Sequence, residues 1–509
     1  MTTIEENPTA HDYRGSKASD IAIAAQNTVK LGLSLLATWG LALVVRIQLP
    51  RHLGPVAFGN YNFADSFAAA FFVFVGFGLE TYVQKEVPVR PEHASDFFGG
   101  AVIVRTVLGA VLIAAMTTVL IVTHRPLHTL QLVLMFAACQ YLIAFGNLLS
   151  SMLRASASVG VLAGINVASK LVWAIGIAVG ILWRVPLVWL AAPAVVAEVL
   201  RNVVLWRAAR HAVGLRWRVD RAETYRVIRA SLPYFANAIA LTLVSKLDIT
   251  LLEFVSPGVE VGWYSAASNL AALAMFLTPV LGWILMPLLA RAKHRSREEF
   301  YSILRRALEA CLVITVPVTL LIALSSQLLV RVAFGVSFLP AARSLQILAP
   351  MLVATYACIL LTTGLILLDR PWLVTVISLT SIVVQPVLML SATQFLADTG
   401  PGGRAVAAAV GVIGMELFQL TLFLWFLGKL AVDRRALLAV AKSLAVALMV
   451  VAIHWQLRGL GDLRLIIDVG AYAALALLLR VESIGDIGYV IELLRNRNRE
   501  RELPSGDPS

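Results

Sequence analysis

Six ionisable side chains lie inside stretches of sequence that are otherwise apolar, and their types decide which chemistry is open to the chain. They are the cations Arg46, Lys170 and Lys246 and the carboxylates Asp65, Asp248 and Glu416. A charge at the centre of a bilayer costs about 3 kcal/mol or more, so each is a candidate functional residue. Arg and Lys bind anionic groups, and a desolvated carboxylate binds a proton or a cation. We therefore expect binding of an anionic ligand and coupling to an ion.

Spacing limits the partners that these residues can have. Lys246 and Asp248 are two residues apart, so they point to nearly opposite sides of one helix and need partners elsewhere. Asp248 has no same-face Lys or Arg on its own helix, which makes it the first candidate for ion coupling, ahead of Asp65 and Glu416. Two interpretations of Arg46 and Lys246 stay open: they bind the ligand, or they form structural ion pairs with the two aspartates.

The mid-segment charges also have structural alternatives. Lys170 faces either a cavity or a buried carboxylate such as Glu198. Glu416 either binds a coupling proton or is a neutral, hydrogen-bonded packing residue. Arg105 lies about two turns from an inner helix end, from which its long side chain could snorkel to the surface. Arg201 can pair with Glu198, three residues before it.

Composition identifies the medium around these charges. Apolar residues make up 59% of the 509 residues and charged residues 14%, and the mean hydropathy is +0.82. Soluble domains hold about 45–50% apolar and about 25% charged residues, so a water-exposed surface cannot be built from this chain. The net charge of +12 would suggest nucleic acid in a soluble protein. Here the composition predicts a polytopic membrane protein instead.

Hydropathy divides the chain into fourteen apolar segments, each near the length of roughly 20 residues that a spanning helix needs. The segments lack the alternation of an outer-membrane barrel, so we expect an all-α polytopic membrane protein with about fourteen transmembrane helices. The predicted limits are 28–49, 57–79, 97–123, 127–148, 157–183, 185–206, 230–254, 261–288, 305–329, 343–368, 371–394, 403–428, 436–455 and 464–480.

Lys and Arg set the predicted orientation. When the N-terminus is placed inside, most basic residues fall in the inner connections, including the linker 207–229, and few fall in the outer ones. Both tails, 1–27 and 481–509, are then cytoplasmic. The basic excess is a topology signal and a contact layer for anionic membrane lipid, and nucleic acid is the poorer interpretation.

The two halves of the chain carry an internal repeat. The stretch Pro55-Val-Ala-Phe-Gly59-Asn-Tyr61-Asn-Phe-Ala64 aligns with Gly258-Val-Glu-Val-Gly262-Trp-Tyr264-Ser-Ala-Ala267. Glu198-x-x-Arg201 likewise aligns with Glu416-x-x-Gln419. An even number of segments separates the partners, so the predicted lobes 28–206 and 230–428 have the same orientation, with 429–480 as an addition. Parallel repeats of this kind form transporters whose substrate site lies between the lobes.

The repeated stretches also resemble those of a known family. Arg51-His-Leu-Gly-Pro-Val-Ala-Phe-Gly-Asn-Tyr61 is similar to a stretch of bacterial polysaccharide flippases. The same holds for Phe334-Gly-Val-Ser-Phe-Leu-Pro-Ala-Ala342 followed by Leu345-Gln-Ile-Leu-Ala-Pro350, and for Asp248 with Gly262-Trp-Tyr264 after it. Over nearly its whole length the chain resembles the O-antigen and exopolysaccharide flippases of the multidrug/oligosaccharidyl-lipid/polysaccharide (MOP) exporter superfamily.

This resemblance implies a function. Such proteins move an undecaprenyl-diphosphate-linked oligosaccharide across the bacterial inner membrane by alternating access, alongside a polysaccharide polymerase and chain-length machinery. Arg46 and Lys246 are then candidates to bind the diphosphate, and Lys170, Asp65 and Asp248 are further cavity candidates. The coupling ion stays open between a proton, sodium and the membrane potential alone.

Other chemistries lack their residues. There is no Walker P-loop, and Cys139, Cys311 and Cys358 fall in apolar segments without a Cys-x-x-Cys pair. We therefore expect no cofactor, no metal and no enzymatic activity. Two alternatives stay open within transport: a cation-coupled drug or metabolite exporter of the same superfamily, and a lipid II flippase. A polysaccharide polymerase or ligase is disfavoured because the outer connections are short and poor in His.

Overall fold

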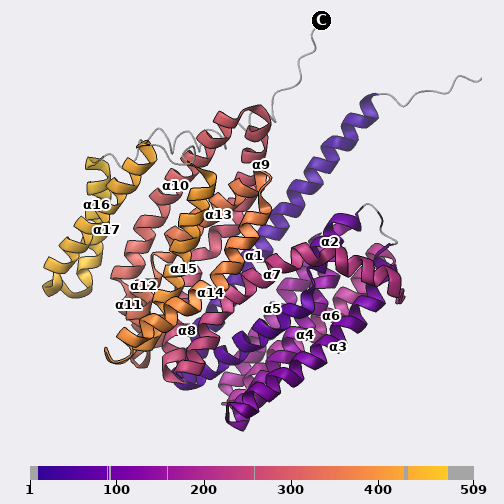
Figure 1. Cartoon of the computed structure of the whole chain (residues 1–509), viewed down its shortest axis with the longest axis horizontal. Coiled ribbons are helices and arrows are strands. Elements are labelled where there is room, and N and C mark those ends of the chain that lie inside the picture. The colour runs from indigo at the N-terminus through magenta and orange to yellow at the C-terminus, as the bar shows by residue number, and fades with distance from the viewer. Residues whose placement is uncertain are drawn as a thin grey trace, which may run out of the picture. The chain divides into compact units, whose positions relative to one another are not determined.

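The computed structural model describes residues 10–88, 90, 93–156, 159–256, 258–428 and 434–479. Within these ranges nearly every residue is helical and no strand occurs, which confirms the all-α fold predicted from hydropathy (Figure 1). The predicted tail 481–509 lies outside the described residues, whereas α1 begins at Ala10, inside the predicted N-terminal tail.

The helices are, in chain order, α1 (Ala10–Gly76), α2 (Leu79–Glu86), α3 (His93–Val122), α4 (Leu127–Ala155), α5 (Val159–Leu182), η1 (Leu187–Ala191), α6 (Ala192–Val213), α7 (Arg221–Val255), α8 (Val259–Leu273), η2 (Ala274–Leu277), α9 (Thr278–Arg295), α10 (Arg297–Leu324), α11 (Ser326–Phe334), η3 (Val336–Phe338), α12 (Ala341–Leu348), α13 (Met351–Leu367), α14 (Pro371–Leu396), α15 (Gly403–Leu427), α16 (Arg434–Gln456), η4 (Arg458–Leu463) and α17 (Arg464–Leu478).

Eight helices in the described part of the chain are long and apolar enough to cross a membrane. The number rises to nine when the bent pair Ala37–Gly76 and Leu79–Glu86 counts as one span. The chain is therefore a multi-pass membrane protein. Some other predicted spans are helical but too short for the same test, such as α17 with its 15 residues. The total of fourteen stays a prediction.

Contacts within the chain group it into two units. The first comprises Met1–Leu53 and Ala64–Thr242, and the second comprises Gly54–Phe63 and Leu243–Ser509. The division falls inside α1 and α7. Residues 54–63 of α1 belong to the second unit and the rest of that helix to the first, and α7 passes from the first unit to the second after Thr242. The sequence had placed the boundary between the lobes in the basic linker 207–229.

Breaks in the backbone lie between and inside the predicted segments. Within α1, Gly54 adopts a φ of +70°, a conformation that glycine reaches without steric cost, and it lies in the connection predicted between the segments 28–49 and 57–79. The span predicted to reach residue 79 ends at Gly76, because Phe77 and Gly78 both have positive φ. In the span predicted over 261–288, η2 separates α8 from α9, and Pro279 follows at the start of α9, where its missing amide hydrogen is tolerated.

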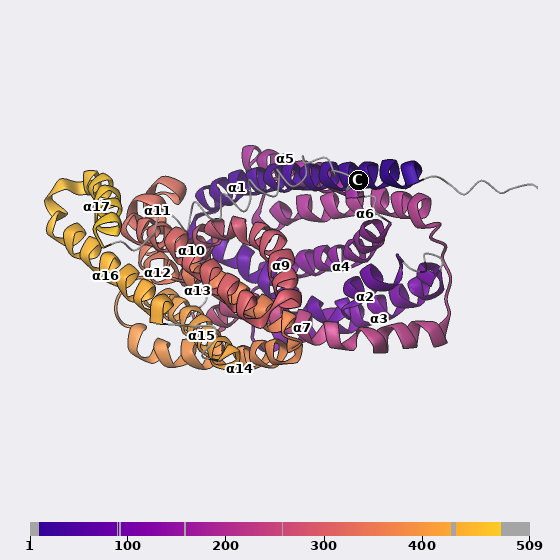
Figure 2. The ribbon, with the colours of Figure 1, turned by 90° about the horizontal axis from the view of Figure 1, so that it is seen from above.

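Each unit has its own apolar core. In the first unit, Phe97, Phe98 and Met152 are fully buried between α2, α3, α4 and α6. In the second unit, Phe300, Leu361 and Phe423 belong to a core that joins α10, α13 and α15. Within the second unit α14 and α15 lie side by side, and α16 and α17 pack on each other and on α10 (Figure 2). These cores fix the helix faces from which the charged residues project.

Candidate functional site

The repeated glycines meet each other within the second unit. A Cβ atom on Gly262 would lie 1.9 Å from the Pro55 carbonyl oxygen, and one on Gly59 would lie 2.8 Å from the Gly262 nitrogen. Real Cβ atoms essentially never approach so closely, so both positions require glycine while these backbones touch. The repeat read from the sequence therefore marks the place where the start of its first copy packs on the start of its second.

Asp248 is buried and bonded to the tyrosine of the same repeat. The Tyr264 hydroxyl donates to Asp248 Oδ2 at 2.5 Å, and the Ile249 amide donates to Asp248 Oδ1 at 2.8 Å. Tyr264 is fully buried and Asp248 is 7% exposed. Lys246 is half-buried and acts electrostatically on the Asp248 carboxylate. Sequence reasoning missed the Tyr264 contact, although the repeat had singled out this tyrosine.

Arg46 and Asp65 belong together in the first unit. Both are half-buried, and the Asp65 carboxylate attracts the Arg46 guanidinium. Asp65 Oδ1 also accepts a hydrogen bond from Gln140 Nε2 on α4 at 3.1 Å. The charges of Asp65, Lys170 and Glu198 all act on buried Cys139 of α4, so three of the predicted partners surround one point in the unit.

Lys170 points away from the lipid-facing side of α5. The exposed apolar stripe of this helix contains Val161, Leu171, Ile175 and Leu182. At 3.6 residues per turn, Lys170 lies roughly 100° or more from each of them around the helix, yet it is exposed. Its Nζ atom lies 5.1 Å from the centroid of the Trp173 ring, within range of a cation–π interaction. Lys170 is therefore an exposed ammonium on a side of α5 away from the exposed apolar stripe.

The repeat-related glutamates differ in their partners. Glu198 Oε2 accepts from Arg201 at 2.9 Å, which confirms the pairing predicted from their spacing. Because the Glu198 carboxylate is already paired with Arg201, it does not need Lys170 as a counter-ion. Glu416 is 7% exposed, and its Oε1 atom accepts from the Thr355 hydroxyl at 2.9 Å. Gln419, which replaces the arginine, donates instead to the Ser381 hydroxyl on α14 at 2.9 Å.

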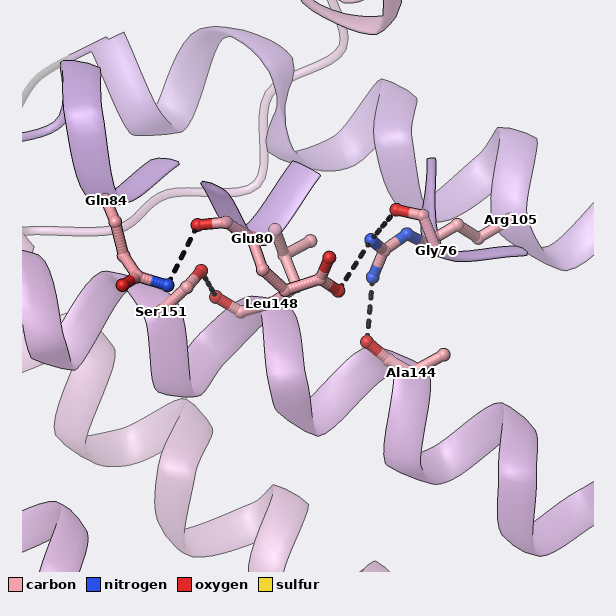
Figure 3. Close-up of polar contacts among 7 residues, drawn as sticks. All are labelled: Gly76, Glu80, Gln84, Arg105, Ala144, Leu148 and Ser151. Atoms are coloured by element: carbon pink, nitrogen blue, oxygen red, sulfur yellow. Dashed lines mark hydrogen bonds and ion pairs between the residues drawn. The ribbon is translucent and has the colours of Figure 1, made fainter. Parts of the chain in front are cut away.

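Arg105 of α3 bonds to residues of three other helices of the first unit, α1, α2 and α4 (Figure 3). Its Nη1 donates to the Ala144 carbonyl at 2.7 Å, and its Nη2 donates to the Gly76 carbonyl at 2.7 Å and to Glu80 Oε1 at 3.2 Å. The residue is only 2% exposed, so the expectation that it snorkels to the surface is wrong. The break after Gly76 leaves a carbonyl at the end of α1 without a helical donor, and the guanidinium supplies one.

The described residues contain no group of three or more His, Cys, Asp or Glu side chains placed to hold a metal ion. Cys139, Cys311 and Cys358 are buried and free. The predicted candidates thus fall into two sets: Arg46, Asp65 and Lys170 in the first unit, and Lys246, Asp248 and Glu416 in the second. Half-buried or buried charges on apolar helices, arranged in two repeats, are the features of a membrane transporter.

Comparison with known proteins identifies the family to which the chain belongs. The family model described as polysaccharide biosynthesis protein matches residues 24–293, a little over half of the chain. The chain therefore belongs to the polysaccharide biosynthesis protein family, as its resemblance implied. No curated protein sequence matches it.

Solved structures support the same fold. The lipid II flippase MurJ in an inward closed conformation superposes with a TM-score of 0.65 at 13% identity, covering 90% of this chain and 98% of MurJ. The MATE transporter VcmN of Vibrio cholerae gives a TM-score of 0.54 at 14% identity, with coverages of 81% and 99%. A MOP superfamily transporter from Pyrococcus furiosus gives 0.53 at 15% identity, with coverages of 78% and 94%. At these identities the likeness concerns the fold.

Proposed function

We propose that this protein is a flippase that carries an undecaprenyl-diphosphate-linked oligosaccharide across the bacterial inner membrane for O-antigen or exopolysaccharide synthesis. The observation that carries the proposal is the exposed Lys170 ammonium, on a side of α5 away from the exposed apolar stripe, in a member of the polysaccharide biosynthesis family. An exposed cation on an apolar helix suits a substrate with a diphosphate group. Arg46 of the first unit and Lys246 of the second unit are two further candidate cations.

The three cations differ in what they offer a diphosphate. Arg46 presents a planar guanidinium that can hold two phosphate oxygens at once and stays charged at low dielectric. Lys170 and Lys246 act as point charges. Asp65 lies close enough to attract Arg46, so the aspartate can hold the guanidinium in place until the substrate phosphate competes for it. Asp248, bonded to Tyr264, has a structural partner in place of a ligand.

Two alternatives belong to the same fold. A lipid II flippase is favoured by the superposition on MurJ, and its substrate would require the same cations. A drug-cation exporter is favoured only by the likeness to MATE transporters, and it would require an anionic cavity. The cations Arg46, Lys170 and Lys246 oppose it by charge repulsion.

Replacement of the cations tests the proposal. In cells that depend on this gene for glycan export, Arg46→Ala and Lys246→Ala should each lower export about tenfold or more, since a charge-assisted hydrogen bond contributes roughly 1.5–3 kcal/mol. Arg46→Lys should keep part of the activity, because the charge remains while the fork is lost. Arg458→Ala, which removes an exposed cation stacked on Trp455, is the control and should leave export unchanged. Full export by both alanine variants at normal protein levels would contradict the cationic site.

A further inference from the structure

Two neighbouring helices of the second unit, α14 and α15, carry buried polar atoms without partners. Glu416 Oε2 on α15 and both amide atoms of Gln385 on α14 are buried and have no hydrogen-bond partner. Gln385 is 1% exposed and Glu416 is 7% exposed. Native structures leave very few buried polar atoms unpaired, so each such atom needs an explanation.

The helix register brings these two side chains to the same level. Gly411 of α15 packs on Met389 of α14, and Gln419 of α15 bonds to Ser381 of α14. Gln385 lies midway between Ser381 and Met389, so it is level with residues 415 and 416 of the antiparallel partner. The Thr355 hydroxyl of α13, bonded to Glu416 Oε1, adds a third helix to this layer of Glu416, Gln385 and Thr355.

The other repeat shows how a buried glutamate at this position is neutralised. In the first unit Glu198 is paired with Arg201 at 2.9 Å, and Arg201 Nη2 also donates to Ser150 at 3.3 Å. In the second unit the corresponding residue is Gln419, which has no charge and bonds to Ser381. Glu416 therefore lacks the built-in cation of its repeat partner, although a buried carboxylate without a counter-charge costs several kcal/mol.

We infer that Glu416 is a proton-binding site, in which a proton taken from water takes the place that Arg201 holds in the first repeat. The new O–H bond at Glu416 Oε2 neutralises the carboxylate and supplies a donor for the Gln385 carbonyl oxygen across the layer. A metal cation fits less well. The layer offers the two Glu416 oxygens, the Gln385 oxygen and the Thr355 hydroxyl, and the Gln385 amide hydrogens would repel a cation.

The surroundings leave Glu416 as the group that changes charge. From α13, the Cys358 thiol contacts the Glu416 carbonyl oxygen at 3.9 Å. Charged groups on the elements packed against α15 lie near its two ends. At the C-terminal end, Arg370 at the start of α14 donates to the Phe426 carbonyl. The others lie at the N-terminal end. Glu260 of α8 accepts from the Gly402 and Ala405 amides, and Arg343 of α12 donates to the Thr399 carbonyl.

This assignment also orders the coupling candidates. Both Asp248 oxygens already accept hydrogen bonds, one from the Tyr264 hydroxyl and one from the Ile249 amide. Asp65 lies beside Arg46 and accepts from Gln140. Glu416 alone among the three has a buried oxygen without a partner. Proton binding at Glu416 does not depend on which substrate the protein carries. The proton site can therefore be wrong while the proposed substrate is right, and the proposed substrate can be wrong while the proton site is right.

Infrared difference spectroscopy of the purified protein in lipid nanodiscs tests the assignment without substrate. A pH jump between acidic and alkaline buffer should reveal the carbonyl stretch of a protonated carboxylic acid, and Glu416→Gln should remove it. Glu198→Gln, the repeat-matched control, should leave that band in place because Glu198 is ionised and paired. A wild-type band that survives Glu416→Gln would overturn the inference, as would the absence of any protonated-acid band across the range.

A second variant keeps the test sharp if Glu416→Gln folds poorly. Gln419→Arg rebuilds the Glu–x–x–Arg pair of the first repeat inside the second. The installed guanidinium should ionise Glu416 and abolish its protonated-acid band, in protein that elutes and melts as a folded transporter. A band unchanged by Gln419→Arg would contradict the account. Loss of the wild-type band on adding Na⁺ at constant pH would overturn the proton in favour of a metal cation.

Discussion

Buried charges in this chain differ in how fully their polar atoms are paired. Glu198 and Arg201 neutralise each other, and Arg105 spreads its donors over Glu80 and two carbonyls. Both arginines thus have a carboxylate as counter-charge, although the Nε atom of each is buried without a partner. Lys170 is exposed on a side of α5 away from the exposed apolar residues of that helix, and Glu416 keeps an unpartnered oxygen. The presence of a counter-charge therefore separates these structural charges from Lys170 and Glu416, the candidates for binding and coupling.

At the residue scale, Arg105 gives a stability prediction. Arg105→Leu should lower the free energy of unfolding by about 3–5 kcal/mol, because it leaves the Glu80 carboxylate and two carbonyls without their donor. Arg105→Lys should cost less, since one ammonium can still pair with Glu80. Chemical denaturation in detergent measures both. The control is Arg226→Ala, which breaks an exposed pair with Glu223 and should change stability by roughly 0–1 kcal/mol. Equal losses for Arg105→Leu and Arg226→Ala would contradict the assignment.

Sequence alone identified these residues but not their contacts. The sequence showed the residue types and their positions in apolar segments. The spacing of three residues between Glu198 and Arg201 predicted their ion pair. Partners on other helices, such as Tyr264 for Asp248 or Gln140 for Asp65, depend on helix rotation and register. Periodicity within one helix carries no information about either. The sequence did not single out Gln385, because one side-chain amide in an apolar helix can find hydrogen-bond partners in many ways.

At the element scale, the breaks in the helices matter as much as the helices. Hydropathy predicted the positions of the apolar segments because it sums over many residues. It did not predict that the segment 57–79 stops at Gly76, since the φ angles of Phe77 and Gly78 decide that point. The internal repeat was more informative: it selected Gly59 and Gly262, the two positions at which backbones touch.

The glycine contact gives the second stability prediction. Gly262→Ala places a methyl group 1.9 Å from the Pro55 carbonyl oxygen, so the two backbones must separate at a cost of about 1–3 kcal/mol. Gly164→Ala is the matched control, because its Cβ meets nothing within 4 Å in the middle of α5. It should be neutral or stabilise by roughly 0.5–1 kcal/mol. Thermal unfolding in detergent compares them, and an undisturbed Gly262→Ala protein would show that the contact is dispensable.

At the scale of the whole molecule, the all-helical fold and the membership of the polysaccharide biosynthesis family agree with what hydropathy and the repeat predicted. The predicted lobes 28–206 and 230–428 stay a prediction. Grouping by contacts places residues 54–63 with the second half and residues up to Thr242 with the first. Charge runs mark where a chain leaves the membrane, and long helices such as α1 and α7 can contribute to two units without any such mark.

Orientation is a further prediction at this scale. The excess of Lys and Arg in alternate connections places Glu223 in the cytoplasm and Ser256 on the outer side. Single-cysteine variants at the two positions, made in a background without Cys139, Cys311 and Cys358, should react with an impermeant thiol reagent from opposite sides of intact cells. Labelling of both positions from outside would reverse or refute the topology.

Translocation of the substrate itself tests the central claim most directly. Purified protein in proteoliposomes should carry undecaprenyl-diphosphate-linked oligosaccharide from one leaflet to the other, detected as glycan that becomes inaccessible to a membrane-impermeant enzyme. Arg46→Ala should slow this transfer about tenfold or more, and protein-free liposomes should show none. Failure to move the oligosaccharide lipid, in the same vesicles that transport a cationic drug or lipid II, would contradict the account.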